Sequence, residues 1–219
     1  GLAQHGASVV IWGTNAERNA QAAEQLRGHG GEVRAAQIDV SDEAAVAAGI
    51  TAIVEEFGRL DQAIANAGIS IPRKSLFDIS LADLERIEAI NVHGVLFTLR
   101  EAARHMIARH EAGDSGGSLV GISSTSAIHG AARNEHYAAT KGAVVTMIRA
   151  MAVELARYGI TANSILPGWI ATDMTAPLHK LCGAVPEAEW TLVEERGDET
   201  VMGAEVEFTP GDWPKEAWP

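Results

Sequence analysis

A tyrosine and a lysine four residues apart are the clearest chemical feature of this sequence. Tyr137 and Lys141 fall in an Ala-rich stretch that predicts a helix over 136–157, so both side chains lie on one face about one turn apart. A nearby ammonium favours the phenolate, and we therefore expect Lys141 to lower the pKa of Tyr137 from about 10 toward the working pH. Such a phenol can exchange a proton with a carbonyl or alcohol. A solvated surface pair is the alternative, and the spacing alone leaves both open.

A serine before this pair could join it. Ser124 follows the apolar run 118–122, which predicts a strand ending at the carboxyl edge of a parallel sheet, where such sheets bind ligands. A hydroxyl there can donate to a substrate oxygen and hold it near Tyr137. Serines after strands are also common turn and cap residues, so Ser124 is informative only together with Tyr137 and Lys141.

Apolar strands alternate with amphipathic stretches over the first 176 residues. We expect strands at 7–13, 32–39, 60–65, 118–122 and 160–166, separated by helices at 16–27, 41–57, 80–110 and 136–157. Asn15, Ser41 and Ser80 are the predicted N-caps of the first three helices. This order predicts an α/β fold, a Rossmann-like doubly wound parallel sheet with helices on both faces.

The pattern breaks at both ends of the chain. Residues 1–6 look like the last turn of a helix that no strand precedes, and the alternation stops after residue 176. Residues 187–219 hold ten acidic residues against Arg196 and Lys215, together with three of the five tryptophans. We therefore divide the chain into an incomplete Rossmann-type domain at 1–176 and an atypical acidic tail at 177–219. The abrupt change favours a shifted reading frame or a mosaic gene over a divergent substrate lid, which would keep a helical period.

Composition argues against several classes of partner. A net charge of −12 does not suit binding to nucleic acid or to an anionic membrane. No apolar run approaches the roughly 18 residues that span a bilayer, and the first residues do not resemble a signal peptide. Cys182 is the only cysteine, so no disulfide forms within the chain, and we expect a reducing, cytoplasmic location.

Taken together, these motifs resemble the short-chain dehydrogenase/reductase family over about residues 1–176. The residues that carry the resemblance are Ser124, Tyr137, Lys141, Asn66-Ala67-Gly68 and Pro167-Gly168. The resemblance implies an oxidoreductase that moves a hydride between a nicotinamide cofactor and a carbon of a small alcohol or carbonyl substrate. In that family the serine orients the substrate oxygen and the tyrosine transfers the proton. The lysine lowers the tyrosine pKa and binds the nicotinamide ribose.

Further site residues follow from the same resemblance. Asn91 matches a helix asparagine that holds a water in the proton relay. Asp39-Val40 resembles the segment that contacts adenine, although Asp39 alone is a plausible helix-entry residue. Asn66-Ala67-Gly68 resembles the segment that steadies the sheet and lies against the cofactor. The residues implied to bind the nicotinamide end of the cofactor are Tyr137, Lys141, Pro167, Gly168, Ile170 and Thr172.

The choice between NAD and NADP depends on the end of the strand at 7–13. NAD enzymes usually place an acid there, whereas this chain has Gly13-Thr14-Asn15. Arg18, one turn later, could reach a 2′-phosphate, and a solvated helix residue is the alternative interpretation. These residues favour NADP. His129 and His136 flank the catalytic segment and could touch substrate, but we expect solvated loop histidines, and without further ligands at useful spacing we expect no metal site.

Two departures from the family leave a second hypothesis open. The family's first strand and its glycine-rich phosphate-binding turn are expected before Gly1, and its last strand is not recognisable after Pro177. We expect the remaining sheet to have an unfilled position. The alternative to an active enzyme is a catalytically impaired fragment, or a non-enzymatic relative, that cannot bind cofactor.

Two further consequences follow from the resemblance. A sugar-nucleotide epimerase or dehydratase would share the tyrosine and lysine pair, but it needs a longer carboxyl-terminal domain than this chain has. Family members pair the helices at 84–110 and 136–157 across a two-fold axis, which implies a homodimer or a homotetramer.

Overall fold

The computed structural model describes residues 1–129, 132–168, 170, 192–196 and 199–202. The chain forms two compact units, Gly1–Ile170 and Ala171–Pro219. In the second unit, the structure describes the backbone of an antiparallel pair, β6 (Leu192–Arg196) and β7 (Glu199–Met202). The candidate site residues within the described ranges all belong to the first unit.

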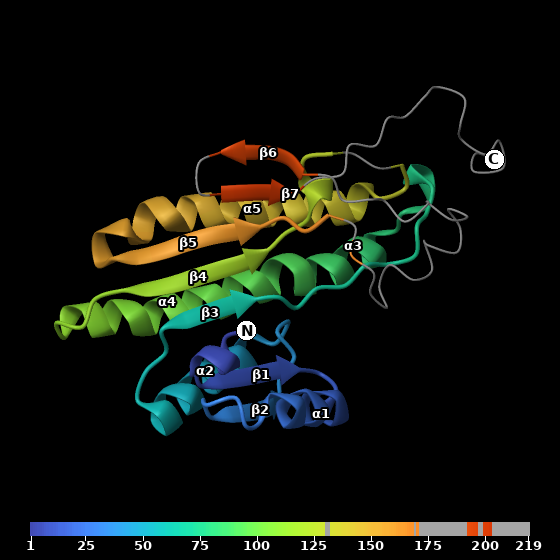
Figure 1. Ribbon diagram of the computed structural model, residues 1–219. Coiled ribbons are helices and arrows are strands. Elements are labelled where there is room, and N and C mark those ends of the chain that lie inside the picture. Colours follow the sequence, from blue (N-terminus) through green and yellow to red (C-terminus); the bar gives the residue numbers. More distant parts are fainter. Residues whose placement is uncertain (130–131, 169, 171–191, 197–198, 203–219) are drawn as a thin grey trace. The chain divides into compact units, whose positions relative to one another are not determined.

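Parallel strands form two sheets in the first unit (Figure 1). One pairs β1 (Val9–Gly13) with β2 (Val33–Gln37), and the other has the order β3 (Gln62–Ala65), β4 (Gly117–Ile122), β5 (Ile160–Ile165). Every pairing is parallel, so the carboxyl ends of β3, β4 and β5 meet at one edge. The predicted α/β fold, with parallel strands and intervening helices, is therefore confirmed.

Helices alternate with these strands in the predicted order. The long ones are α1 (Ala16–Leu26), α2 (Glu43–Phe57), α3 (Leu81–Glu88), α4 (Val95–Glu111) and α5 (Glu135–Leu155). A π-helix, η3 (Ala89–Gly94), joins α3 to α4. The short 3₁₀ turns are η1 (Ala3–His5), η2 (Leu76–Asp78), η4 (Thr125–Ala127) and η5 (Ala156–Tyr158). Gly6, with φ 86°, ends η1 in the left-handed conformation that glycine tolerates best.

Two of the three predicted helix caps are confirmed. The Asn15 side chain accepts the Arg18 N–H at α1, and Ser80 forms a capping box with Asp83 at α3. The prediction that Ser41 caps α2 is wrong, because Asp42 caps it by accepting the Ala45 N–H at 3.0 Å. The carboxylate of Asp39 accepts both the N–H and the hydroxyl of Ser41, which holds Ser41 in a turn, so the helix begins later.

The main core lies between the three-stranded sheet and helices α4 and α5. Leu99 and Met106 of α4, Leu119 of β4 and Val144 of α5 are fully buried there. Helix α2 packs on α4, and Glu43 forms an ion pair of 2.6 Å with Arg100. In the described part of the chain, no helix is both long enough and apolar enough to cross a bilayer.

The π-helix comes very close to the segment that follows β2. A Cβ atom added to Gly94 would lie 2.6 Å from Val40 Cγ2, closer than real Cβ contacts allow. Only glycine therefore fits at this crossing, which fixes Val40 against the helix that also carries Asn91.

Candidate active site

The strand end after β4 and the first turns of α5 bring the predicted catalytic residues together. Ser124 lies just beyond β4 in an extended conformation and caps η4. Its hydroxyl oxygen accepts a hydrogen bond of 2.8 Å from the Ser126 hydroxyl, and the Ser124 side chain is near enough to the Tyr137 phenol to lower its pKa. Ser123, the preceding residue, donates a bond of 2.7 Å to the Lys141 carbonyl and so ties α5 to the end of β4.

Lys141 is the buried cation of the site. Its side chain is 4% exposed, and its ammonium donates a hydrogen bond of 2.8 Å to the carbonyl of Ile122 at the end of β4. The ammonium nitrogen lies 5.7 Å from the centroid of the Tyr137 ring. Burial disfavours the charged form and lowers the pKa of Lys141 to about 8, so this group titrates close to physiological pH.

Tyr137 holds its proton more strongly than the sequence led us to expect. Burial raises the pKa of Tyr137, and the hydrogen bond from Ser124 offsets only part of that rise. The prediction that Lys141 lowers the pKa of Tyr137 is therefore wrong for this structure. The reason is geometric, because the Lys141 ammonium is hydrogen-bonded to the Ile122 carbonyl beside the ring, and its own charge is disfavoured by burial.

Asn91 links three segments from within the π-helix. Its side chain is fully buried, its Oδ1 accepts the Ile69 N–H at 2.8 Å, and its Nδ2 donates to the Ile69 carbonyl at 2.9 Å. The same Nδ2 lies 3.2 Å from the Thr140 hydroxyl on α5. Asn91 thus holds the segment after β3 against the helix that carries Tyr137 and Lys141.

Gly68 lies between Asn91 and Lys141, in the segment predicted to face a cofactor. A Cβ atom added there would be 3.2 Å from Lys141 Nζ and 3.4 Å from Asn91 Oδ1. Asn66, which begins the same segment, donates its N–H to the Ile64 carbonyl. With Ala67 between them, these residues form the segment that follows β3.

The other predicted cofactor residues are spread over neighbouring strand ends. Asp39 and Val40 follow β2, and the Ser41 hydrogen bonds lower the pKa of Asp39. Pro167 follows β5, and its carbonyl accepts the N–H of Thr125 in η4 at 3.0 Å, next to Ser124. Gly168 is exposed, as is Ile170 at 56%. Thr172 lies outside the described residues.

Sequence reasoning missed two buried polar groups that organise the site. The Thr140 hydroxyl donates to the Tyr137 carbonyl at 2.8 Å and accepts from Asn91, and Ser123 makes the bond to Lys141 described above. Both are 3% exposed. The signal for Thr140 was its position between Tyr137 and Lys141 in the predicted helix.

His136 is also placed differently from its prediction. We expected two solvated loop histidines, and His129 is indeed exposed. His136 instead lies on α5 and is 3% exposed, and neither ring nitrogen has a hydrogen-bond partner among the described residues. Burial lowers its pKa, while Glu135 and Asp83 raise it and Lys74 lowers it further.

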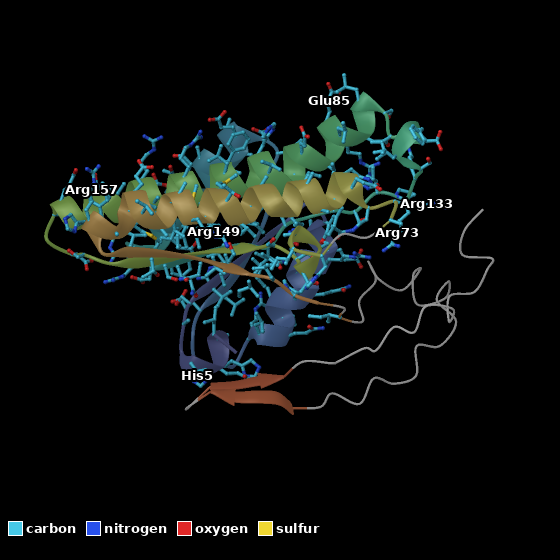
Figure 2. All side chains as sticks on the ribbon, turned by 90° about the horizontal axis from the view of Figure 1, so that it is seen from above. His5, Arg73, Glu85, Arg133, Arg149 and Arg157 are labelled. Carbon is cyan, nitrogen blue, oxygen red and sulfur yellow. The ribbon has the colours of Figure 1, made fainter. Side chains whose placement is uncertain are left out.

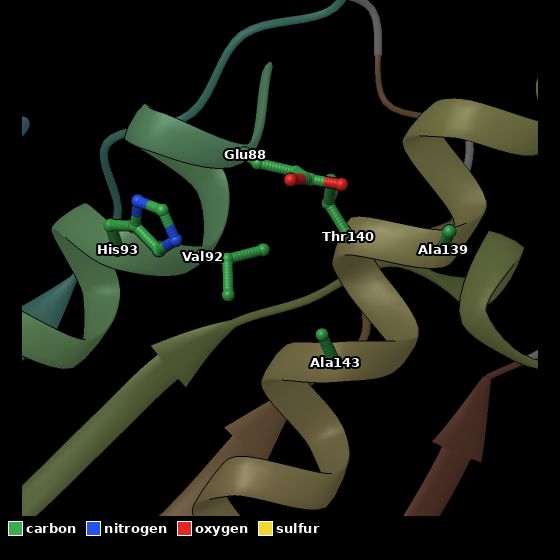
Figure 3. A pocket seen from close by; sticks show the side chains of 6 residues that line it. All are labelled: Glu88, Val92, His93, Ala139, Thr140 and Ala143. Carbon is green, nitrogen blue, oxygen red and sulfur yellow. The ribbon is translucent and has the colours of Figure 1, made fainter. Parts of the chain in front are cut away.

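A pocket of about 170 Å³ lies between the α3–η3 segment and α5, with Thr140 in its lining (Figure 3). Figure 3 shows side chains of the α3–η3 segment facing side chains of α5 across it. Its lining residues are Glu88, Val92, His93, Ala139, Thr140 and Ala143. None of these is Ser124, Tyr137 or Lys141, so this pocket is separate from the candidate catalytic groups. Within the described ranges, no group of three or more His, Cys, Asp or Glu side chains could hold a metal ion.

Comparison with known proteins gives consistent matches across the first unit. A family model described as short chain dehydrogenase matches residues 1–182. Gluconate 5-dehydrogenase of Gluconobacter oxydans is 36% identical over 202 residues, which cover 89% of this chain and 77% of that protein. L-rhamnose 1-dehydrogenase of a Sphingomonas species is 34% identical over 175 residues, which cover 80% of this chain and 67% of that protein.

Solved structures agree with this match. A gluconate 5-dehydrogenase from Burkholderia cenocepacia, in complex with NADP and tartrate, is 34% identical with a TM-score of 0.74, and the match covers 83% of this chain and 71% of that one. An NAD⁺-bound xylitol dehydrogenase is 26% identical with a TM-score of 0.77, covering 85% and 71% of the two chains.

Proposed function

The chain belongs to the short-chain dehydrogenase/reductase family, and we propose that it is an NAD(P)-dependent oxidoreductase acting on an alcohol or carbonyl group of a small molecule. One observation carries this proposal: the Lys141 ammonium lies 5.7 Å from the ring of Tyr137, and the Ser124 side chain is near enough to the phenol to lower its pKa. This arrangement, at the carboxyl edge of a parallel sheet, places a proton donor beside a hydroxyl that can hold a substrate oxygen.

Each side chain has a distinct role in the proposed reaction. The bound nicotinamide would supply or accept the hydride. The Ser124 hydroxyl orients the reacting oxygen, and the Tyr137 hydroxyl gives its proton to that oxygen in reduction or takes one from the alcohol in oxidation. Because burial raises the pKa of Tyr137, the protonated phenol predominates at neutral pH, which suits carbonyl reduction. Asn91 positions α5 and the segment after β3, and we assign to it the water of the proton relay.

The residues present fit the nicotinamide–ribose half of NAD(P). The Lys141 ammonium has three donors, and its hydrogen bond to the Ile122 carbonyl occupies one of them. Gly68 leaves the approach to that ammonium free of a side chain, because a Cβ there would lie 3.2 Å from it. We assign Tyr137, Lys141 and Gly68 to the ribose end, and Pro167, Gly168, Ile170 and Thr172 to the carboxamide end.

The end of β1 favours NADP over NAD. Gly13-Thr14-Asn15 carries no acid that would repel a 2′-phosphate, and the exposed Arg18 follows in the first turn of α1. The Asn15 side chain accepts the Arg18 N–H, so the backbone here is held in place. We assign Asp39 and Val40 to adenine contacts and Asn66-Ala67-Gly68 to the inner edge of the cofactor site.

A non-catalytic relative is the alternative function. The relatives reported above are dehydrogenases by name, and they match over the segment that holds Ser124, Tyr137 and Lys141. These matches favour the enzyme. We also propose a homodimer or homotetramer that pairs α4 and α5, since the small side chains Ala139 and Ala143 would let a second helix approach closely.

The test is cofactor binding by the full chain followed by turnover. Titration with NADPH and NADH, followed by nicotinamide fluorescence, is expected to give saturable binding that is tighter for NADPH. Alcohols and ketones are then screened with Tyr137→Phe as the inactive variant and Tyr158→Phe as its matched control, because Tyr158 lies in η5, outside the catalytic group. Absence of binding to either cofactor would overturn the proposal in favour of a non-catalytic relative.

A further inference from the structure

We propose that Arg73 and Arg133 form a carboxylate-binding pair at the end of the first unit where Ser124 and Tyr137 lie, so that the substrate is a small hydroxylated organic acid. The inference rests on the proposed function and deepens it, since it names the class of molecule whose alcohol or carbonyl group meets Tyr137. It depends on where the two arginines are anchored and on the absence of ion pairs to them in the described part of the chain.

Arg133 lies immediately before the N-cap of α5, the helix that carries Tyr137, and has a strained backbone conformation. It lies four residues before Tyr137, just ahead of the first turn of α5. With φ 60°, it is the one non-glycine residue at positive φ among those the structure describes, and its N–H donates to the Glu135 carboxylate at 3.3 Å. Such conformations cost roughly 1–3 kcal/mol and concentrate at ligand sites. The strain is therefore a second indication that Arg133 serves a ligand.

Arg73 lies in the segment after β3, which is tied to α5 through the Asn91 side chain. It follows Ile69 by four residues, and Ile69 is held by two hydrogen bonds to the Asn91 side chain, which also binds Thr140 on α5. The next residue, Lys74, lies close enough to His136 for its charge to lower the pKa of that histidine. The segment of Arg73 therefore runs beside the first turn of α5.

Figure 2 shows Arg73 and Arg133 at the same end of the molecule. In Figure 1, the segment between β3 and α3 and the segment before α5 likewise reach beyond the carboxyl ends of the strands. Ser124 and Tyr137 belong to that end as well, because they follow β4 and begin α5. An anion held between the two guanidiniums would thus extend toward the phenol.

In the part of the chain that the structure describes, no carboxylate forms an ion pair with either of these arginines. Lys74 is paired with Asp83 at 2.7 Å, and the arginines Arg34, Arg59, Arg100 and Arg109 are paired with carboxylates. Arg73 and Arg133 are exposed, and within the described ranges neither guanidinium has an ion pair or a side-chain hydrogen bond. Glu135, the carboxylate nearest in sequence to Arg133, accepts a hydrogen bond from the Arg133 backbone N–H and not from its guanidinium.

Guanidinium groups bind carboxylates through two parallel hydrogen bonds, which gives both affinity and orientation. The chain as a whole carries a net charge of −12, which repels anions, so an acidic substrate needs a local cationic site. A gluconate 5-dehydrogenase similar to this chain was solved with tartrate, a hydroxylated dicarboxylate. That bound molecule belongs to the substrate class that the two arginines indicate.

The experiment compares an acid with its neutral analogue of the same carbon skeleton. D-gluconate and D-glucitol are titrated into the full chain by calorimetry, with and without NADP⁺. We expect gluconate to bind, and Arg73→Gln and Arg133→Gln each to weaken it about tenfold while leaving glucitol unchanged. Arg149→Gln is the matched control, because Arg149 is an exposed arginine of α5 away from the strand ends (Figure 2).

A second variant separates charge from folding. Arg133→Gly removes both the strain and the guanidinium, so it is expected to raise thermal stability and still to lose gluconate binding. Equal binding of gluconate and glucitol, or gluconate binding that survives both Gln variants, would overturn the inference. Binding of inorganic phosphate in preference to gluconate would overturn it too.

The outcomes keep the two proposals apart. If NADPH binds but gluconate has no advantage over glucitol, the inference fails while the proposed function stands. If gluconate binding depends on both arginines and neither cofactor binds, the anion site stands and the proposed function fails.

Discussion

The Lys141 ammonium lies 5.7 Å from the centroid of the Tyr137 ring, and burial acts on both groups. It disfavours the ammonium and the phenolate alike, lowering the pKa of Lys141 to about 8 and raising that of Tyr137 above its usual value. In this structure the lysine therefore loses its proton at a lower pH than a free lysine, whereas the tyrosine loses its proton at a higher pH than a free tyrosine. The four-residue spacing brings the groups together, but desolvation determines how they titrate.

Replacing Tyr137 with Phe is expected to lower kcat/KM by about 10²- to 10⁴-fold, the usual contribution of a positioned acid or base. The phenyl ring keeps the packing, so the melting temperature should change little. Steady-state rates of Tyr137→Phe and Tyr158→Phe with the same substrate make the comparison. Equal losses in the two variants would remove Tyr137 from the mechanism.

Ser124→Ala is expected to raise the pKa of Tyr137 further, because the Ser124 hydrogen bond is the interaction that lowers it. The chain has two tyrosines, so ¹³C labelling of the tyrosine ring gives two resonances, and Tyr158 serves as the internal reference. The pKa is read from the chemical shift as pH is raised. An unchanged or lower pKa would mean that Ser124 does not contact the phenol in solution.

Lys141→Met is expected to stabilise the protein most at neutral pH. The pKa of Lys141 falls from 10.5 in the unfolded chain to about 8 in the folded one, so between these values the unfolded state binds more protons and stability rises with pH. Below pH 8 the buried charge costs about 3 kcal/mol at most, less the lost bond to Ile122. Urea unfolding at pH 7 and pH 10 measures both chains. The advantage of the variant should shrink at pH 10, and an advantage that grows there would contradict the sign.

Asn91→Ala is expected to cost about 2–4 kcal/mol of unfolding free energy. It removes both bonds to the Ile69 backbone and one to Thr140, and it leaves buried polar groups unpaired. Thr140→Val is the control, because it removes the hydrogen bond between Asn91 and Thr140 but keeps the two between Asn91 and the Ile69 backbone. Urea denaturation measures each chain. If Asn91→Ala loses no more unfolding free energy than Thr140→Val, the two hydrogen bonds to the Ile69 backbone contribute little to stability.

His136→Leu is expected to make the protein less sensitive to acid. Burial holds the pKa of His136 below its usual value of 6.5, so the unfolded state binds the proton more readily and stability is lost as pH falls below about 6.5. Melting temperatures at pH 5 and pH 8 should therefore differ less in the variant. His129→Leu, at an exposed position, should keep the wild-type difference. A variant as acid-sensitive as the wild type would place the acid response elsewhere.

The alternation of strands and helices along the chain and the grouping of Ser124, Tyr137 and Lys141 could be predicted, because apolar alternation and a fixed helical spacing depend on local sequence. The cap at Asp42 could not, since two neighbouring polar residues compete and the choice depends on the Asp39 turn. The burial of His136 also escaped prediction, because it depends on α3 packing against α5 from fifty residues earlier in the chain. The pKa of Tyr137 required knowledge of burial, which spacing does not contain.

The π-helix between α3 and α4 affects which insertions and deletions the chain can tolerate. Buried residues recur every fourth position through it, at Ile87, Asn91, Val95, Leu99 and Ala103. In a regular α-helix, four residues overshoot a full turn by about 40°, so such a row would wind away from the core. The wider turn at Ala89–Gly94 slows that drift and keeps the row inward. Deleting one residue there would rotate α3 by about a quarter turn relative to α4, and would turn the residues of α3 that contact α5 away from that helix.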